Sequence, residues 1–381
     1  MRRIRLALGA EGEGCLMAGL KITVLGLSIT SSWGNGHATT WRALLKALAA
    51  RGHTITFLER DVPWYRAHRD LPQASWCRIA LYQDLAELRQ RFASCVAEAD
   101  VVVVGSYVPD GVAVARWVQA TAGAMIAFYD IDTPVTLAKL ARGDHEYLAP
   151  ELVPHFDLYL SFAGGPSLAR LEQGYGARRA RAFYCAVDPA AYRPLGLPER
   201  CALGYLGTYS TDRQPAVERL LIEPARTLPE ERFVVAGPQY PGDLAWPANV
   251  ARHDHVPPER HAEFYNQLRF ALNVTRADMV AAGWSPSVRL FEAAACGVPV
   301  ISDDWPGLAE LLTPGREVLI AHDAADVVHY LREIGPELRA QIAQAARARV
   351  LAAHTAAHRA QEFEREVLAV GVTRMALAAE A

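Results

Sequence analysis

The residues best suited to chemistry lie in one stretch of the second half, Gly283–Gly315. There Ser285 has the side chain of a good helix N-cap, and Pro286 fits the first position of a helix. This pattern predicts a helix that starts here, runs through Cys296 and ends at Gly297. The backbone amides at a helix start attract anions. The stretch therefore predicts an anion-binding site.

The same stretch also supplies side chains for that site. We expect the amides of Ser287, Val288 and Arg289 to contact a phosphate or a diphosphate, together with the Arg289 guanidinium. Glu292 lies past the first turn and before three alanines, where a carboxylate needs a partner. The two adjacent hydroxyls of a ribose would bond both of its oxygens. The alternative is an ion pair with Arg289 on a solvated helix face.

A second group of candidates follows the first expected strand, in the segment SSWGNGHATTWR. Its glycines allow tight turns next to a ligand, and His37 opens the helix that follows. At that position the imidazole could act as a base or as a hydrogen-bond donor. We place Asn35 and Gly36 on the same wall of the site. The alternative is a capping histidine without chemistry.

The same loop also permits a different interpretation. Gly34 and Gly36, with Glu59 at the end of the next strand, match part of the dinucleotide-binding fingerprint, whose acid binds a ribose. The third glycine of that fingerprint is Thr39 in this chain. The match is partial and leaves the Glu292 stretch unexplained. It keeps an NAD-dependent oxidoreductase as a distant alternative.

Two aspartates, Asp130 and Asp132, stand at the end of another expected strand, in AFYDIDTP. An Asp-x-Asp pair could hold a divalent cation. It is also typical of a turn, with Asp130 capping and Pro134 ending the strand. We favour a third interpretation, in which Asp132 lines the acceptor side, beside Asp130, and serves as the base. Tyr107, in GSYVPDG, is a weaker candidate for the same wall.

Three further segments of the second half could contribute to the anion site. Thr208, Tyr209 and Arg213 follow a strand and could contact phosphate oxygens, or could form a surface turn. Gly237 and Pro238 end another strand, where the backbone could approach a nucleotide closely. Three histidines follow in the next segment, and we interpret them as exposed loop residues because no carboxylate pattern supports a metal site: His253, His255 and His261.

Strands and helices alternate along the chain and predict an α/β fold of doubly wound parallel sheets. The expected strands are 21–28, 53–59, 100–104, 125–129 and 158–162, then 202–208, 231–237, 270–276 and 298–304. A Pro-rich stretch without a steady period separates the two sets. We expect one domain at 17–195, a second at 196–352 and a C-terminal helix at 353–381 that packs back onto a domain. We interpret residues 1–16 as a disordered tail or a misplaced start.

Composition narrows the classes of protein. The chain has 381 residues, of which 51% are hydrophobic and 21% charged, as in ordinary globular proteins. Its formal net charge of −3 gives no general attraction to nucleic acid or to anionic lipid. The six cysteines form no C-x-x-C pair, which favours reduced thiols in the cytoplasm and no zinc site. No apolar run approaches the length of a membrane span.

The run RLFEAAACGVPVISDDWPGLAELLTPGREVL resembles the nucleotide-sugar-binding segment of GT-B glycosyltransferases, most closely the CgeB-like, spore-maturation group. SSWGNGHATTWR and FYDIDTP also look like that group, so the resemblance begins near Met17. It implies two Rossmann-like domains facing a central cleft, with the donor ribose on Glu292 and the diphosphate at Ser287 and Arg289. It also implies base contacts from Val256, sugar or acceptor contacts from His37, and no need for a metal.

The sequence departs from the retaining GT-B pattern at one position. Those enzymes often carry a second acid eight residues before the ribose-binding glutamate, and this chain has Trp284 there. The departure leaves the transferred sugar and the stereochemical course open.

Together these observations predict a glycosyltransferase that moves a sugar from a nucleotide-diphosphate sugar to an unidentified acceptor. His37 and Asp132 are the candidate bases. The acceptor could be a small molecule, a glycan or a protein, and we expect no nucleic-acid partner and no cofactor besides the donor. A nucleotide-sugar epimerase of the same fold and a non-catalytic nucleotide-binding domain are the alternatives. The oligomeric state stays open.

Overall fold

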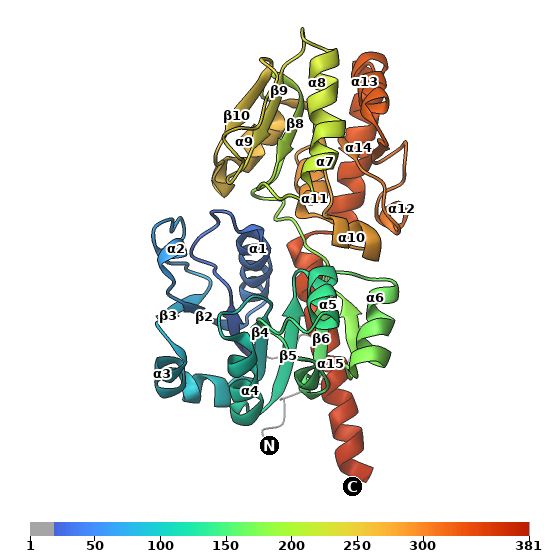
Figure 1. Cartoon of the computed structure of the whole chain (residues 1–381). Helices are drawn as coiled ribbons and strands as arrows, with labels where there is room; N and C mark the ends of the chain where they lie inside the picture. The colour runs from blue at the N-terminus through green and yellow to red at the C-terminus, as the bar shows by residue number, and fades with distance from the viewer. Residues whose placement is uncertain (1–18, 381) are drawn as a thin grey trace. The chain divides into compact units, whose positions relative to one another are not determined.

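The computed structural model describes residues 19–380, with side chains up to residue 373, and divides the chain into two compact units (Figure 1). Unit 1 comprises the residues up to Tyr184 and those from Ala356 onward, and unit 2 is Cys185–Thr355. The chain thus passes from unit 1 to unit 2 after Tyr184, before the predicted boundary at 195/196, because the Pro-rich connection belongs with unit 2. The prediction for residues 1–16 lies outside the described residues.

Unit 1 is built on a parallel sheet with the strand order β3-β2-β1-β4-β5-β6-β7. Val102 and Val104 face one layer of helices, and Val103, which lies between them, faces the other, as the two-residue repeat of a strand requires. The strands are β1 (Lys21–Gly26), β2 (Thr54–Arg60), β3 (Arg78–Tyr82), β4 (Val101–Gly105), β5 (Met125–Asp130), β6 (Leu158–Ser161) and β7 (Ala180–Ala182).

Helices cover both faces of this sheet (Figure 1). The core on one face includes apolar side chains of α3 (Leu85–Ala97) and α4 (Gly111–Thr121). On the other face, α1 (Gly36–Ala50) packs against the C-terminal helix α15 (Ala356–Glu380). The remaining helical segments are α2 (Pro63–Arg66), α5 (Thr133–Ala141), η1 (Pro150–His155), α6 (Pro166–Ala169) and η2 (Arg170–Gly174).

A buried ionic cluster ties α15 to unit 1. Glu364 accepts two hydrogen bonds from Arg51, and its Oε1 lies 2.8 Å from His53 Nε2. Hydrogen bonds from Arg51 and His53 outweigh burial and lower the pKa of Glu364. The expected C-terminal helix therefore packs back onto the unit that begins the chain.

Unit 2 repeats the arrangement with the strand order β10-β9-β8-β11-β12-β13, again parallel. Its strands are β8 (Cys201–Leu206), β9 (Phe233–Ala236), β10 (Val250–His253), β11 (Leu268–Asn273), β12 (Val300–Ser302) and β13 (Leu319–Ile320). One face packs on α7 (Gln214–Val217), η3 (Glu218–Ile222), α8 (Glu223–Thr227) and α13 (Ala324–Glu333). The direction in which successive strands are added to the sheet reverses between β8 and β11. Open α/β sheets bind ligands at such a switch point.

The other helices of unit 2 include two that contact each other, α11 (Val288–Ala295) and α14 (Pro336–Ala353). Phe291 of α11 stacks on His354, with ring centroids 4.5 Å apart. The remaining helices are η4 (Pro258–Arg260), α9 (His261–Asn266), α10 (Ala277–Ala282) and α12 (Leu308–Leu311). Across the described residues, no helix is both long and apolar enough to cross a membrane.

Four strands were not predicted from the sequence: β3, β7, β10 and β13. Strand β3 lies inside a stretch that reads as a loop, because its RIALY segment is short and mostly half-buried. The others have two to four residues and lie at or near the sheet edges, where few side chains are buried. Short edge strands carry little of the periodic signal that identifies a strand.

Candidate functional site

Arg289 occupies the switch point of unit 2. Its guanidinium donates through Nε to the Leu206 carbonyl at the end of β8, and through Nη1 to Asn273 Oδ1 at the end of β11, 3.1 Å away. Nη1 also donates to the Val274 carbonyl at 3.4 Å. The guanidinium carbon lies 5.0 Å from the Tyr205 ring centre, a cation–π distance. The sequence places a fixed positive charge where the two central strands end.

The helix that carries Arg289 begins later than predicted. Its N-cap is Ser287, whose Oγ accepts from the Arg289 amide at 3.3 Å and from Arg289 Nη1 at 2.8 Å. The prediction of Ser285 as the cap is therefore wrong. Ser285 is buried, and Ser287 still has an extended backbone, with φ −77° and ψ 144°, so the helix begins two residues later than predicted. Val288 is the first helical residue, and the Arg289 amide expected to meet a phosphate is engaged by the cap.

Glu292 is buried on α11 and does not form the alternative ion pair with Arg289. It is 2% exposed, and its Oε2 accepts a hydrogen bond from Tyr265 Oη at 3.1 Å. Tyr192 also lies near this carboxylate. Burial and the carboxylate together raise the pKa of Tyr192 and of Tyr265 well above 10, so both hydroxyls keep their protons. Neither tyrosine has a sequence pattern that would have identified it, because both contacts depend on the fold.

His261 completes this cluster and is not the exposed loop residue that was predicted. Its Nδ1 lies 3.1 Å from Tyr192 Oη and 4.0 Å from Glu292 Oε2, and its Nε2 lies 3.0 Å from the Val256 carbonyl oxygen. His261 begins α9, with 14% of its side chain exposed. His253 is exposed, as predicted, and His255 is half-buried. The cluster brings together Glu292 and Val256, two of the predicted donor-binding residues.

The other predicted donor-binding residues lie in two loops that pack on each other. A Cβ on Gly237 would lie 2.0 Å from the Gly207 carbonyl oxygen, so this backbone contact requires a glycine, and the expected approach to a nucleotide stays a prediction. Pro238 is buried, and its carbonyl accepts from the Tyr209 amide at 3.0 Å. Thr208 precedes Tyr209 in the same half-buried loop.

Arg213 is half-buried at the start of α7, and its Nε donates to Ser210 Oγ at 2.8 Å. Arg213 thus holds the loop that follows β8.

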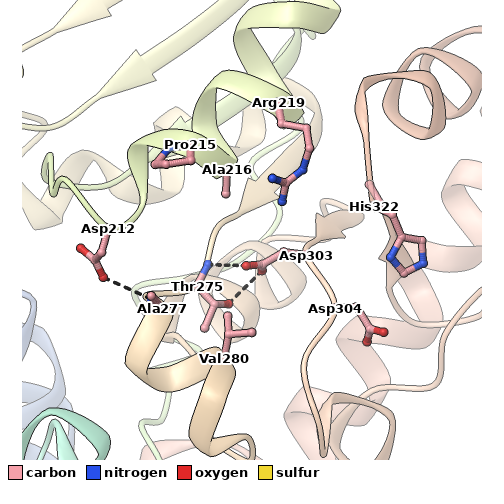
Figure 2. A pocket seen from close by; sticks show the side chains of 11 residues that line it. Asp212, Pro215, Ala216, Arg219, Thr275, Ala277, Val280, Asp303, Asp304 and His322 are labelled. Carbon is pink, nitrogen blue, oxygen red and sulfur yellow. Dashed lines mark hydrogen bonds between the residues drawn. The ribbon is translucent and has the colours of Figure 1, made fainter. Parts of the chain in front are cut away.

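A hollow of about 280 Å³ lies at the strand ends of the same unit (Figure 2). Asp303 forms part of its floor and is bonded to the Thr275 amide and hydroxyl, both at 2.9 Å. Burial raises the pKa of Asp303 despite these bonds. Figure 2 shows Arg219 reaching from its helix toward these two residues, with His322 on another wall. None of the predicted donor-binding residues lines this hollow.

Unit 1 brings the two candidate bases together. His37 Nε2 lies 3.4 Å from Asp132 Oδ2, with 16% and 14% of the side chains exposed. Tyr107 lies beside them, with its ring centre 5.3 Å from that of His37. Tyr107 has a φ of +62°, an unusual backbone conformation for a large side chain. The sequence identified these three residues separately, and the fold makes them one cluster.

Asp130 belongs to the interior, not to an acceptor wall. Both oxygens are engaged, Oδ2 by Tyr159 Oη at 2.6 Å and Oδ1 by Thr136 Oγ1 at 2.7 Å. Burial raises the pKa of Asp130 to about 6. Asp130 therefore supports Asp132, whose amide donates to it at 3.3 Å.

Within the described residues, no group of three His, Cys, Asp or Glu is arranged to hold a metal ion.

Asn35 also has a structural role in place of the predicted acceptor contact. It is buried, caps α1 by accepting from the His37 amide at 3.1 Å, and donates to the carbonyls of Ser28 and Ser31. Gly36 is the first residue of α1 and is exposed. Asn35 thus fixes the position of His37.

Glu59 removes the support for dinucleotide binding. Its side chain is fully buried and accepts four hydrogen bonds, from Ser28 Oγ, the Ile29 and Thr30 amides and Thr30 Oγ1, at 2.6–3.0 Å. A carboxylate engaged by its own loop cannot also bind a ribose. The NAD-dependent alternative therefore loses the acid on which it rested.

Part of the chain matches a known protein family. Residues 213–365 match a family model described as glycosyl transferase-like. The matched range contains Arg289, Glu292, Tyr265 and His261. No curated protein sequence matches the chain.

Solved structures share the fold over nearly the whole chain. HepE from Anabaena in complex with UDP-glucose is 15% identical, with a TM-score of 0.67 over 92% of this chain and 100% of that one. Sucrose-phosphate synthase from Thermosynechococcus elongatus is 16% identical, with a TM-score of 0.66 over 94% and 99%. An alpha-glucosyltransferase in complex with UDP-glucose and DNA is 12% identical, with a TM-score of 0.70 over 92% and 100%. The predicted pair of Rossmann-like α/β domains, as in GT-B glycosyltransferases, is confirmed.

Proposed function

We propose that the protein is a glycosyltransferase that transfers a sugar, of the hexose class, from a nucleotide-diphosphate sugar to an acceptor. The observation that carries this proposal is the placement of Arg289 across the ends of β8 and β11, with the buried Glu292 one turn further along α11. The glycosyl transferase-like match covers both residues. The solved neighbours whose structures contain UDP or UDP-glucose support a uridine donor.

In this proposal unit 2 holds the donor. The Arg289 charge and the start of α11 would stabilise the departing diphosphate, which carries the negative charge that develops as the sugar leaves. Glu292 would accept hydrogen bonds from the ribose hydroxyls. Ser287, Val288 and Val256 keep their proposed contacts to the diphosphate and the base, and Thr208, Tyr209 and Arg213 keep theirs to phosphate oxygens.

Unit 1 supplies the base in the same proposal. His37 would remove the acceptor proton, while Asp132 orients the imidazole and stabilises its protonated form. The paired bases favour a catalytic protein over one that only binds a nucleotide, and an epimerase would use the same donor site without an acceptor.

Donor chemistry without a metal is part of the proposal. It is supported by the Asp130 oxygens, which are bonded to Tyr159 and Thr136, and by Asp132, which faces His37. Membership of the CgeB-like group and location in the cytoplasm stay predictions.

The test is a screen of thermal stability with UDP, GDP, ADP, dTDP, CDP and NAD at equal concentrations, since a ligand of the folded state raises the melting temperature. We expect one nucleoside diphosphate to stabilise the wild type, and Glu292→Ala to lose that effect. A Glu263→Ala variant, which changes an exposed glutamate of α9, should keep it. Stabilisation by NAD alone, or an unchanged response in Glu292→Ala, would contradict the proposed donor site.

A further inference from the structure

Two segments of unit 1 form a surface that carries exposed aromatic rings. One segment, 27–35, follows β1 and contains Trp33, and the other, 61–72, follows β2 and contains Trp64 and His68. The Trp33 ring stacks on His68, with centroids 4.3 Å apart, and lies at 66° to the Trp64 ring, 4.6 Å away. Trp64 is 49% exposed and is the one aromatic among the exposed large hydrophobic side chains of the described residues. We call these three rings the aromatic platform.

Hydrogen bonds between the two segments hold the aromatic platform in place. Ser31 Oγ donates to the His68 carbonyl at 2.8 Å, and the Asp70 amide donates to the Thr30 carbonyl at 3.1 Å. His68 Nδ1 also lies 3.0 Å from the Trp64 carbonyl oxygen. A ligand that packs on rings fixed in this way pays little conformational entropy to order them. The platform is therefore suited to binding.

The charged side chains around the aromatic platform are paired with one another. Asp70 accepts both arms of the Arg42 guanidinium at 2.8 Å, and Asp61 forms ion pairs with Arg66 and Arg69. These pairs leave no arginine or lysine of either segment without an acid, in segments that the structure describes throughout. A nucleic acid would need free cations for its phosphates. The platform therefore favours a ligand without charge.

The aromatic platform lies at the edge of the sheet where the candidate bases stand. Strands β1, β2 and β5 run parallel in one sheet, so the segments that follow them leave the same edge. Trp33 is four residues from His37, a separation over which a chain spans at most about 14 Å. A ring on the platform and a hydroxyl at His37 can thus belong to one short molecule.

We propose that the aromatic platform holds a sugar ring of the acceptor, so that the acceptor is an uncharged carbohydrate. The inference rests on the proposed function, since it takes unit 1 as the acceptor side. One face of a pyranose ring presents C–H groups with partial positive charge, which pack on the negative face of an indole, while the hydroxyls stay at the rim in water. Trp64 is then a specificity-determining residue, which contacts the acceptor and not the donor.

The experiment measures binding of the full-length protein to an array of immobilised neutral oligosaccharides at saturating UDP. The array carries glucose, galactose, mannose, rhamnose and N-acetylglucosamine in different linkages. We expect the wild type to bind at least one class of these glycans, and Trp64→Ala to lose at least about tenfold in affinity for it. Trp64→Tyr keeps an aromatic face and should stay within about threefold of the wild type.

Three further measurements separate contact with the acceptor from a structural effect. Trp64→Ala should keep the melting temperature of the wild type and its stabilisation by UDP, because the side chain is half exposed and lies in unit 1. With the bound glycan as the acceptor, Trp64→Ala should raise KM for that glycan by the same factor and leave kcat nearly unchanged. Leu338→Ala, at an apolar side chain of α14 that is 48% exposed, should leave glycan binding unchanged.

The outcomes separate this inference from the function on which it rests. A wild type that UDP stabilises but that binds no glycan of the array, or binds one as tightly as Trp64→Ala does, overturns the inference and leaves the donor site standing. Binding of an oligodeoxynucleotide in place of the glycans overturns the choice of a carbohydrate. Glycan binding that depends on Trp64, without stabilisation by any nucleoside diphosphate, supports the carbohydrate site and contradicts the proposed donor site.

Discussion

The two units share the strand order around their first strand but place opposite charges where the strands end. In unit 2 the guanidinium of Arg289 bridges β8 and β11. In unit 1 the corresponding positions carry Glu59 near the end of β2, Asp130 at the end of β5 and Asp132 just after it. The same topology therefore presents a fixed cation between β8 and β11 in unit 2 and carboxylates at the strand ends of unit 1, although unit 2 also carries Asp303 after β12.

This difference assigns two kinds of chemistry to one fold. A fixed cation at a switch point suits a diphosphate, whose charge it neutralises. Carboxylates near an imidazole suit the removal of a proton, because they stabilise the protonated ring. The Rossmann-like scaffold therefore determines where a site forms, while a few side chains at the strand ends determine what that site can bind.

The largest effect should come from removing the cation of unit 2. Arg289→Ala leaves the Leu206 and Val274 carbonyls without their donor, so we expect the free energy of unfolding to fall by about 3 kcal/mol. We also expect nucleoside diphosphate affinity to fall at least about a hundredfold. Urea denaturation and calorimetry measure the two effects. Arg289→Lys, which keeps the charge but loses the fork, should lie between. Unchanged nucleotide affinity in both variants would contradict the comparison.

The next effect concerns a carboxylate of unit 1. Glu59→Gln replaces an oxygen that accepts buried hydrogen bonds with an amide that cannot accept them, which should lower the free energy of unfolding by about 2–3 kcal/mol. Nucleotide affinity should not change, since our proposal places the donor on unit 2. Glu98→Gln, at an exposed glutamate of the same unit, serves as the control. A large loss of nucleotide affinity in Glu59→Gln with retained stability would revive the dinucleotide alternative.

A third prediction uses the pH dependence of Asp130. Its pKa is raised from the ordinary 3.8 to about 6, so the ionised form is less stable in the folded protein than in the unfolded chain. The resulting cost is absent below pH 3.8 and complete above about pH 6. The stability of Asp130→Asn relative to the wild type should therefore rise by about 2–3 kcal/mol between pH 4 and pH 7. A difference that stays constant across this range would show that Asp130 ionises without a cost.

The smallest effect tests the start of α11. Ser287→Ala removes the cap that bonds the Arg289 amide and should cost about 1 kcal/mol of stability, measured by thermal or urea denaturation. Ser285→Ala is the matched control. Its Oγ is buried without a partner among the described residues, so its removal should cost little or should stabilise. The reverse order of the two variants would restore the predicted N-cap.

Local patterns in the sequence predicted the parts of this molecule that depend on near neighbours. The alternation of strands and helices identified both domains, because long buried strands and amphipathic helices carry a strong periodic signal. The pair of Arg289 and Glu292 could be proposed because both lie on one predicted helix. His37 and Asp132 were each predicted as a base for similar local reasons, without any indication that they meet.

The remainder depends on contacts between distant segments. Tyr192 stands in a connection without regular structure, and only the fold brings it to His261 and Glu292. The packing of Gly237 on Gly207 could not be predicted, because Gly207 follows another strand. Ser285 and Ser287 are both good caps by residue type, and only the structure shows that Ser287 bonds the Arg289 amide.

The central claim is that unit 2 binds the donor and that unit 1 supplies the base. The most direct test measures turnover and donor affinity together. UDP release from UDP-glucose is followed in the wild type and in His37→Ala with water as the acceptor of the glucosyl group, and calorimetry gives the UDP affinity. The account predicts release by the wild type, a loss of at least about a hundredfold in His37→Ala, and equal UDP affinity in both proteins. Equal release by the two proteins, or a His37→Ala variant that loses UDP binding as well as turnover, would contradict it.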